Sequence, residues 1–474
     1  MFNFNLENFR LEAAKYLKIG LPILGSQIVM YGLTTTDYIM AGLYSPNDLA
    51  GVGIAASIFN PIYFLTAGIM FGIGPIIAQH FGAKEFILIQ QKTRKYLWYG
   101  LLIGAIFFLM LNNSWVVFNF LETDTKIVEI GSGYLQAISY GVFAMTIFQA
   151  LRNYSEGITQ TRIIFYISLL IFFLNIPLNY FFIFYLDFGG VGCGYATSVI
   201  SWLGLLIAFT VTFFAKEYKE TFLYDKFETP DITTFKELLR IGAPISFGIF
   251  VELSLFSGAA LIISFFGATA LAAHTIAINL AGLFFMLPLS IGLASAIRVG
   301  NLIGEKNFAR ANYAANFTTR TSLLFAFFNI FVFLTFGSTL IGFYTNTPEV
   351  AEIALGLLVY AAIFQIPDAL SFSAIGTLRG HKDTFATMLN LVISFWFFAI
   401  PVGVFLAFNE YTGIPNVHIP SASFGIPVYS LKAKKTPTGI AKNQNEITRL
   451  NIVAKVSLWP LSVPIAEKLR ASGI

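Results

Sequence analysis

The sequence contains two copies of one hydrophobic segment, and this duplication limits the folds that the chain can adopt. Residues 18–84 align with residues 240–306 at a constant offset of 222, without a gap. The stretch KIGLPI at 18–23 recurs as RIGAPI at 240–245, and GAK at 82–84 recurs as GEK at 304–306. Apolar segments resemble each other by chance, but here the register is continuous and the glycines and prolines coincide. Two related hydrophobic halves are typical of secondary transporters.

The composition indicates a membrane protein. Of the 474 residues, 56% are hydrophobic and only 11% are charged, and the mean hydropathy is +0.73. A soluble domain with these values is implausible. A helix that spans a bilayer needs about 20 residues. We therefore predict an all-α polytopic membrane protein with eleven spans, at residues 17–42, 52–79, 96–117, 127–151, 163–184, 190–214, 241–265, 272–297, 314–338, 350–375 and 385–408.

The basic residues predict how the chain is oriented. If the eleven spans alternate, 20 of the 21 Lys and Arg residues between Met1 and Ile414 lie in the N-terminal arm or in loops on one side. Only Lys126 falls on the other side. Loops on the cytoplasmic side carry the excess of Lys and Arg in membrane proteins. We therefore expect a multi-pass protein of the cell inner (plasma) membrane with a cytoplasmic N-terminus.

The spacing of the repeat predicts how the two halves are related. Six predicted spans separate the two starts, and an even number restores the orientation. A second aligned stretch, at an offset of 223, places Gly157 on Gly380. We expect two six-helix bundles related by a pseudo-two-fold axis along the membrane normal, which face a central cleft and rock to open it to alternate sides. The predicted divisions are an N-lobe at 1–214, a cytoplasmic linker at 215–236, a C-lobe at 237–414 and a basic tail at 415–474.

Three acidic residues lie well inside predicted spans: Asp37, Glu252 and Asp368. A carboxylate in mid-bilayer costs at least about 2.5–3.5 kcal/mol. Glu252 and Asp368 lie near the midplane, and Asp37 lies closer to the outer surface, judged from the helical rise. No Lys or Arg in mid-span is available to neutralise them. Such acids are protonated or bind a cation, as an ion-coupled pump requires. A protonated carboxyl that only links helices by hydrogen bonds is the structural alternative.

Polar side chains in the fifth and sixth spans could join one of these acids. Asn175 and Asn179 are four residues apart, so they share a helix face and could both donate to a carboxylate. Thr197 could reach the same place from the next helix. The alternative is a purely structural contact between helices, worth about 0.6 kcal/mol each. The residues alone slightly favour this alternative.

Other function classes find less support. The single Cys193 excludes an internal disulfide and a multi-Cys metal site, and a net charge of +4 is too small to indicate a nucleic-acid partner. An enzyme would need a nucleophile–base or metal constellation, but only His274 of the four His residues lies in a span. A flippase for a lipid-linked saccharide would share the helical plan. It would need basic residues in its cavity to meet pyrophosphate, whereas the mid-span charges here are acidic.

Several motifs together resemble the multidrug and toxic compound extrusion (MATE) transporters, in their NorM-type bacterial branch. The resemblance covers roughly residues 10 to 415, in order and without large gaps. Each motif alone is weak, but the set is specific. The motifs are GLP at 20–22, DYIMAG at 37–42, SEG at 155–157, LNIPLN at 174–179, GGVGCG at 189–194, AAH at 272–274 through Asn279, RVG at 298–300 and LRGHKDT at 378–384.

This resemblance implies a twelve-helix exporter that exchanges Na⁺ or H⁺ inward for organic, often cationic, drugs outward. By analogy, Asp37, Asn175, Asn179 and Thr197 match the N-lobe cation or proton site. Glu252 and Asp368 match the C-lobe acids in cation coupling. A transient Na⁺ at Glu252 and Asp368 is the only metal expected, and no cofactor is expected. The expected partners are small organic cations and the lipid bilayer, with no nucleic acid, and the expected state is a monomer.

The tail after Pro415 departs from the family pattern. It contains no apolar run long enough for a twelfth span, and it carries eight Lys and Arg residues against two acids. We hypothesise that a shifted reading frame near Asn416 has replaced the last helix, and we expect a tail of this composition to be disordered. A divergent extension is the alternative. Sequencing the gene distinguishes the two, because a frameshift predicts a single-base change that restores an apolar span.

Overall fold

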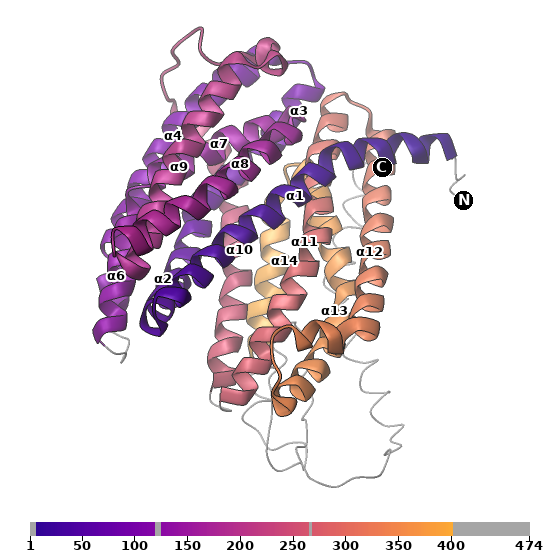
Figure 1. Ribbon diagram of the computed structural model, residues 1–474. Coiled ribbons are helices and arrows are strands. Elements are labelled where there is room, and N and C mark those ends of the chain that lie inside the picture. The colour runs from indigo at the N-terminus through magenta and orange to yellow at the C-terminus, as the bar shows by residue number, and fades with distance from the viewer. Residues whose placement is uncertain (1–5, 119–124, 265–267, 402–474) are drawn as a thin grey trace, which may run out of the picture. The chain divides into compact units, whose positions relative to one another are not determined.

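The computed structural model describes residues 6–118, 125–264 and 268–401, and every regular element among them is helical (Figure 1). The first repeat contributes α1 (Leu6–Tyr44), α2 (Pro46–Thr66), η1 (Ala67–Gly72), α3 (Ile73–Gly82), α4 (Phe86–Asn112), α5 (Trp115–Phe118), α6 (Thr125–Ser139), α7 (Val142–Gly157), α8 (Thr161–Tyr180), η2 (Phe181–Tyr185) and α9 (Gly189–Phe214). The short helix η3 (Lys216–Thr221) follows. The second repeat contributes α10 (Ile232–Ser264), α11 (Ala268–Gly304), α12 (Phe308–Gly342), α13 (Pro348–Gly380), α14 (Thr384–Val392) and η4 (Ile393–Ala399).

The helices confirm the predicted all-α membrane fold. Within the described residues, nine helices are long and apolar enough to cross a membrane, and α6 with α7 forms a further candidate that bends by 53°. A shorter apolar helix covers Thr384–Phe397. Most helices extend beyond the predicted spans, because hydropathy detects the hydrocarbon core and the helices continue into the polar headgroup region. The last predicted span, 385–408, runs past the described residues, and the tail at 415–474 lies wholly outside them.

The chain divides into two compact units that differ from the two repeats. The first unit comprises Met1–Phe250, Ser290–Phe317 and Gly376–Phe385, and the second comprises Val251–Leu289, Thr318–Ile375 and Ala386–Ile474. The first unit therefore contains the first repeat together with one end of α10, α11, α12 and α13. The sequence-based division into lobes at 214 and 237 stays a prediction.

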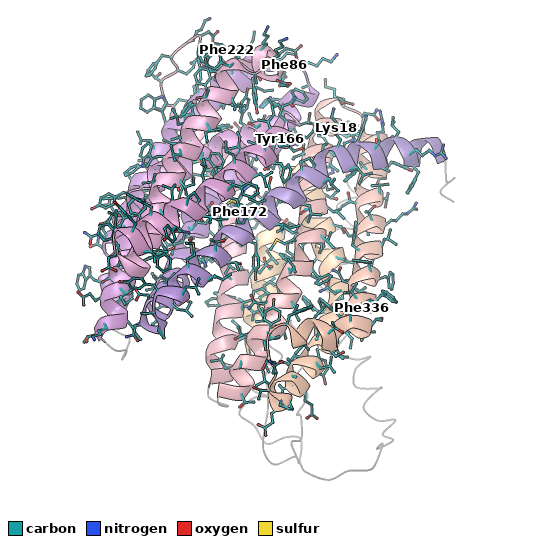
Figure 2. The ribbon with its side chains drawn as sticks, viewed as in Figure 1. Lys18, Phe86, Tyr166, Phe172, Phe222 and Phe336 are labelled. Atoms are coloured by element: carbon teal, nitrogen blue, oxygen red, sulfur yellow. The ribbon has the colours of Figure 1, made fainter. Side chains whose placement is uncertain are left out.

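Close helix packing organises the first unit. The helices α1 and α8 lie side by side, as do α4 and α7, and α6 and α9. Along α1, Gly25 and Gly32 face the rings of Phe165 and Phe172 on α8, and Figure 2 shows Phe172 beside α1. In the second unit, Phe336 on α12 is 49% exposed, and Figure 2 shows it on the outer side of its helix. Exposed rings of this kind suit contact with lipid.

The internal repeat is visible as repeated packing within the first unit. A Cβ added to Gly157 would lie 2.8 Å from the Cβ of Ile77, and one added to Gly380 would lie 3.0 Å from the Cβ of Val299. Gly157 corresponds to Gly380 in the repeat, and Ile77 corresponds to Val299. The same helix–helix approach therefore occurs in both copies, which is what a duplicated unit requires.

Residues 216–231, which we call the strap, are packed against the helices α4 and α7 of the first unit. Arg94 Nε on α4 donates to the carbonyl of Leu223 at 2.7 Å, and the Arg94 guanidinium also pairs with Asp225. The hydroxyl of Tyr154 on α7 donates to the carbonyl of Thr221 at 2.9 Å. The predicted linker is therefore docked along its length rather than extended away from the helices.

Candidate functional site

Three helices of the first unit bring four predicted site residues together. Asp37 on α1 is 8% exposed, and Asn175 and Asn179 on α8 are 1% and 0% exposed. Asn179 Nδ2 donates to Asp37 Oδ1 at 2.6 Å and to Asn175 Oδ1 at 3.0 Å. Thr197 Oγ1 on α9 donates a longer bond of 3.4 Å to Asp37 Oδ2. We call these four residues the Asp37 cluster.

The two asparagines play different parts from those expected. The sequence suggested that both could donate to a carboxylate. In the structure only Asn179 reaches Asp37, while Asn175 accepts a hydrogen bond from Asn179. The four-residue spacing stacks the two side chains along one helix face, so the nearer one contacts the carboxyl and the other supports it.

Irregular backbone marks this end of α8. Pro177 lies between the two asparagines, where it lacks an N–H and removes one helical hydrogen bond. The α-helix then passes into the π-helix η2. π-Helical turns are rare and occur frequently at functional sites. The motif LNIPLN thus provides both the polar side chains and the local departure from helical geometry.

Glycines bring α9 close enough to complete the cluster. A Cβ on Gly192 would lie 2.8 Å from the backbone carbon of Phe182, and one on Gly194 would lie 2.7 Å from the carbonyl oxygen of Tyr134. Both distances are too short for a real Cβ contact, so only glycine permits this approach. Cys193 and Thr197 consequently reach Asp37, and the Cys193 thiol lies 3.7 Å from the Asp37 carbonyl oxygen.

The surroundings of Asp37 are polar but contain no basic group in the described part of the chain. Its neighbours are neutral amides, neutral hydroxyls that include those of Tyr38 and Tyr134, and the Cys193 thiol. Asn179 Oδ1 is buried and accepts no hydrogen bond. An unsatisfied buried acceptor costs roughly 1–3 kcal/mol. The cluster therefore holds a carboxyl and a spare amide oxygen, which can be satisfied by a proton donor or a small hard cation.

The two remaining predicted acids belong to the second unit. Glu252 lies on α10 and Asp368 on α13, and both are half-buried. Their carboxyl groups lie close enough to interact electrostatically. Pro367 interrupts the hydrogen bonding of α13 directly beside Asp368. The structure thus associates these two acids with each other, and their unit is not the one that contains Asp37.

A buried amide pair on α12 and α13 was missed by sequence reasoning. Asn329 Nδ2 donates to Gln365 Oε1 at 2.7 Å, and the two residues are 0% and 3% exposed. Gln365 lies three residues before Asp368, about one helical turn away. The available signal was the presence of two uncharged amides inside predicted spans, whereas only the amides of the fifth span were weighed.

A buried ion pair was missed as well. Arg152 Nε on α7 donates to Glu156 Oε1 at 2.8 Å, and Arg152 Nη2 donates to Gln27 Oε1 on α1 at 2.8 Å. Both charged residues are at most 8% exposed. The predicted span ends at residue 151 and places Arg152 in a loop, whereas α7 continues to Gly157. The i,i+4 spacing of opposite charges was the signal that could have found this pair.

Comparison with known proteins identifies a family. The family model described as MatE matches the chain twice, over residues 22–181 and 244–405. The two matches begin at the prolines that the internal repeat aligned. A probable multidrug resistance protein NorM of Acinetobacter baylyi is 34% identical over 403 residues, which are 84% of this chain and 90% of that protein. The multidrug resistance protein NorM of Vibrio cholerae is 32% identical over 410 residues, 86% of this chain and 90% of that protein.

Solved structures share the fold. A Vibrio cholerae MATE transporter, VcmN, matches with a TM-score of 0.83 at 15% identity, covering 98% of both chains. An outward-facing multidrug resistance MATE family transporter matches with a TM-score of 0.78 at 18% identity, covering 90% of this chain and 94% of that one. At these identities the likeness concerns the fold alone.

Proposed function

The chain belongs to the MatE family of transporters, and we propose that it is a secondary active exporter of organic, often cationic, drugs. In this proposal Na⁺ or H⁺ moves inward through the plasma membrane while the drug moves outward, and the two lobes expose the substrate alternately to each side. The relatives that carry the names NorM and MdtK are called multidrug resistance proteins, which supports this substrate class.

The observation that carries the proposal is the Asp37 cluster. Neutral donors cannot fully offset the burial of an ionised carboxylate, which costs several kcal/mol in a protein interior. Asp37 is therefore favoured either with a proton or with a bound cation. The unpartnered Asn179 Oδ1 offers an additional oxygen ligand beside it. A site in which a proton and a cation can replace each other can bind the coupling ion and release it.

The acid pair Glu252 and Asp368 gives the proposal a route to coupling. Glu252 and Asp368 repel each other when both are ionised, so a proton, a transient Na⁺ or an organic cation stabilises the pair. One acid cannot tightly hold the coupling ion and a cationic drug in the same state. Competition between the two ligands then links their fluxes, because each shifts the conformational equilibrium by its difference in affinity.

The direct test uses the purified full chain in proteoliposomes. Uptake of a fluorescent organic cation is measured under an imposed Na⁺ gradient, and separately under an imposed pH gradient. We expect one gradient to drive uptake and its dissipation to abolish it. Asp37→Asn and Asp368→Asn should each lower the gradient-driven rate by about tenfold or more, because each removes an ionisable group.

The exposed acid Glu129 on α6 provides a matched control. Glu129→Gln changes the charge by the same amount and should leave the rate unchanged. Gradient-independent movement of the dye would contradict the antiport proposal. Transport of a fluorescent lipid-linked saccharide, without transport of the cation, would favour a flippase instead. Wild-type rates in Asp368→Asn would remove that residue from the coupling site.

A further inference from the structure

Two glycines related by the repeat make backbone contact between the halves of the chain. Gly82 ends α3 and Gly304 ends α11, at the end of the first unit that we predict to be cytoplasmic. A Cβ on Gly82 would overlap the carbonyl oxygen of Asn301, and a Cβ on Gly304 would overlap that of Gln79. Asn301 and Gln79 also correspond in the repeat. The two helix ends therefore cross in a nearly symmetric way, and their backbones touch.

A buried carboxylate on α1 ties the first repeat to the second at this crossing. Glu12 Oε2 accepts from Arg298 Nε at 2.9 Å, and Glu12 Oε1 accepts from Arg298 Nη2 at 2.7 Å. Arg310 on α12 adds a third bond to Oε1 at 3.1 Å. The Glu12 side chain is 2% exposed and that of Arg298 is 6% exposed. A bidentate pair of this kind is strong and geometrically specific.

At the start of α10, in the second repeat, Glu237 makes the corresponding contact with the first repeat. Glu237 Oε2 lies 2.6 Å from Lys92 Nζ on α4, and Glu237 Oε1 lies 4.0 Å from Lys382 Nζ in the turn after α13. Glu12 and Glu237 each lie near the start of their repeat. Each therefore pairs with a basic residue that follows the glycine crossing in the other repeat.

We propose that these contacts form a clasp that holds the predicted cytoplasmic face closed and that must open once in each transport cycle. The clasp consists of Gly82, Gly304, Glu12 and Glu237 with the partners named above. The backbones touch at the crossing, so no solute passes between α3 and α11 while the clasp is closed. The inference rests on the proposed alternating access. Loss of Glu12 would leave Arg298 buried without its main partner, which disfavours the closed state.

Distance measurements test the clasp without measuring transport. Cys193 is the only cysteine, so Cys193→Ala gives a background for two spin labels. Ile87 on α4 and Ala309 on α12 are exposed and correspond in the repeat. The substitutions Ile87→Cys and Ala309→Cys provide the two labelling sites. We expect a dominant short-distance population with a minor longer one. Glu12→Gln and Glu237→Gln together should raise the ratio of long to short distances by about tenfold, within the usual range of conformational coupling.

Substitutions at the crossing and a charge exchange sharpen the test. Gly304→Ala should also enlarge the long-distance population, because its Cβ would overlap a backbone atom. Gly53→Ala is the matched control, since a Cβ there has no atom within 4 Å. Glu237→Lys should open the clasp, and adding Lys92→Glu should partly restore the short distance by rebuilding one pair.

The outcomes are separable from those of the transport test. An unchanged distance distribution in the Glu12→Gln/Glu237→Gln chain would overturn the clasp even if the chain transports drugs. A shifted distribution in that chain, with Gly53→Ala and Glu129→Gln like the parent, supports it. If the distances shift but no gradient drives drug uptake in any chain, the clasp stands as a conformational lock and the proposed export function fails.

Discussion

At the scale of single residues, the Asp37 cluster shows how an uncharged amide can serve a buried acid. Asn179 Nδ2 donates to both Asp37 and Asn175. The Asn179 Oδ1 atom accepts no hydrogen bond. Buried polar atoms without partners are uncommon in native proteins. The unsatisfied oxygen supports the proposal that the coupling ion binds reversibly beside Asp37.

The two asparagines should differ in their importance for ion binding. Asn179→Ala removes the contact with Asp37 and the spare oxygen, and it should weaken binding of the coupling ion by about 10–100-fold, as loss of supporting partners does at metal sites. Asn175→Ala removes only the acceptor behind Asn179 and should cost less. Ion dependence of proteoliposome transport measures both. Equal losses in the two variants would contradict this order.

At the scale of elements, side chains from one helix complete the ends of another. Asp48 on α2 accepts from the backbone N–H of Gly190 at 2.5 Å and from the hydroxyl of Ser45 at 2.5 Å. The first N–H groups of a helix have no partner within it. Asp48 therefore caps α9 from a neighbouring helix, which gives the motif GGVGCG a structural role.

Removing this cap should destabilise the first unit. Asp48→Ala leaves the N–H of Gly190 and the hydroxyl of Ser45 without their acceptor, and losing a cap costs about 0.5–2 kcal/mol. Thermal unfolding in detergent should show a lower midpoint, and transport should fall in proportion to the folded fraction. Glu129→Ala is the control at an exposed acid on α6. A midpoint equal to that of the parent would show that water replaces the Asp48 carboxylate.

The strap should detach when its main anchor is lost. Arg94 is 6% exposed and holds the strap through carbonyl and carboxylate contacts. Lys216, Lys219 and Lys226 are already exposed, but cleavage also requires the backbone around them to leave its docked conformation, so Arg94→Gln should speed tryptic cleavage between the repeats by roughly several-fold. Arg162→Gln, at an exposed arginine on α8, is the matched control. Equal cleavage rates in the two variants would mean that the remaining contacts suffice.

The strap should stay docked down to mildly acidic pH. The hydrogen bond from Lys95 holds the pKa of the Asp231 carboxyl well below its usual range. A lowered pKa in the folded state stabilises the strap above the unfolded pKa of about 3.9, and this contribution is lost as the pH falls through the folded value. Hydrogen exchange of strap amides, corrected for intrinsic rates, should change only below about pH 4. A transition near pH 6 would assign control to another group.

At the scale of the whole molecule, the charge pattern makes a testable statement about sidedness. Almost all the Lys and Arg residues that flank the predicted spans lie on the predicted cytoplasmic side. Lys126, at the start of α6, is the exception. Many of these basic residues lie on helix ends rather than in loops, among them Arg94, Arg298 and Arg310. Arg94 and Arg298 are buried and pair with Asp225 and Glu12, so these two residues hold helices and strap together at this end of the first unit.

Single cysteines in the Cys193→Ala background should report this orientation. Lys126→Cys should react with a membrane-impermeant maleimide added to intact cells, and Lys84→Cys should react only after the membrane is permeabilised. Both residues are exposed, so a difference reflects sidedness rather than burial. The reverse pattern would place the N-terminus outside.

Properties that depend on local sequence were accessible without a structure. Hydropathy over about 20 residues identifies spans, and the constant offset identifies the duplication, because neither requires knowledge of which helices touch. The acids inside predicted spans, Asp37, Glu252 and Asp368, are found in the same way. Asn175, Asn179 and Thr197 were selected from helical spacing and family resemblance, but their individual bonds could not be assigned.

Which distant residues meet depends on how the helices pack. The pairing of Glu12 with Arg298 spans 286 positions, and the crossing at Gly82 and Gly304 depends on helix axes that no local pattern specifies. Helix crossing angles follow from side-chain packing over whole faces, so a contact between helices is a property of the assembled unit. The duplication, the membrane-spanning helices and the acids inside them therefore follow from the amino-acid sequence alone. That Asn179 contacts Asp37 and that Glu12 pairs with Arg298 follows from the packing of the helices.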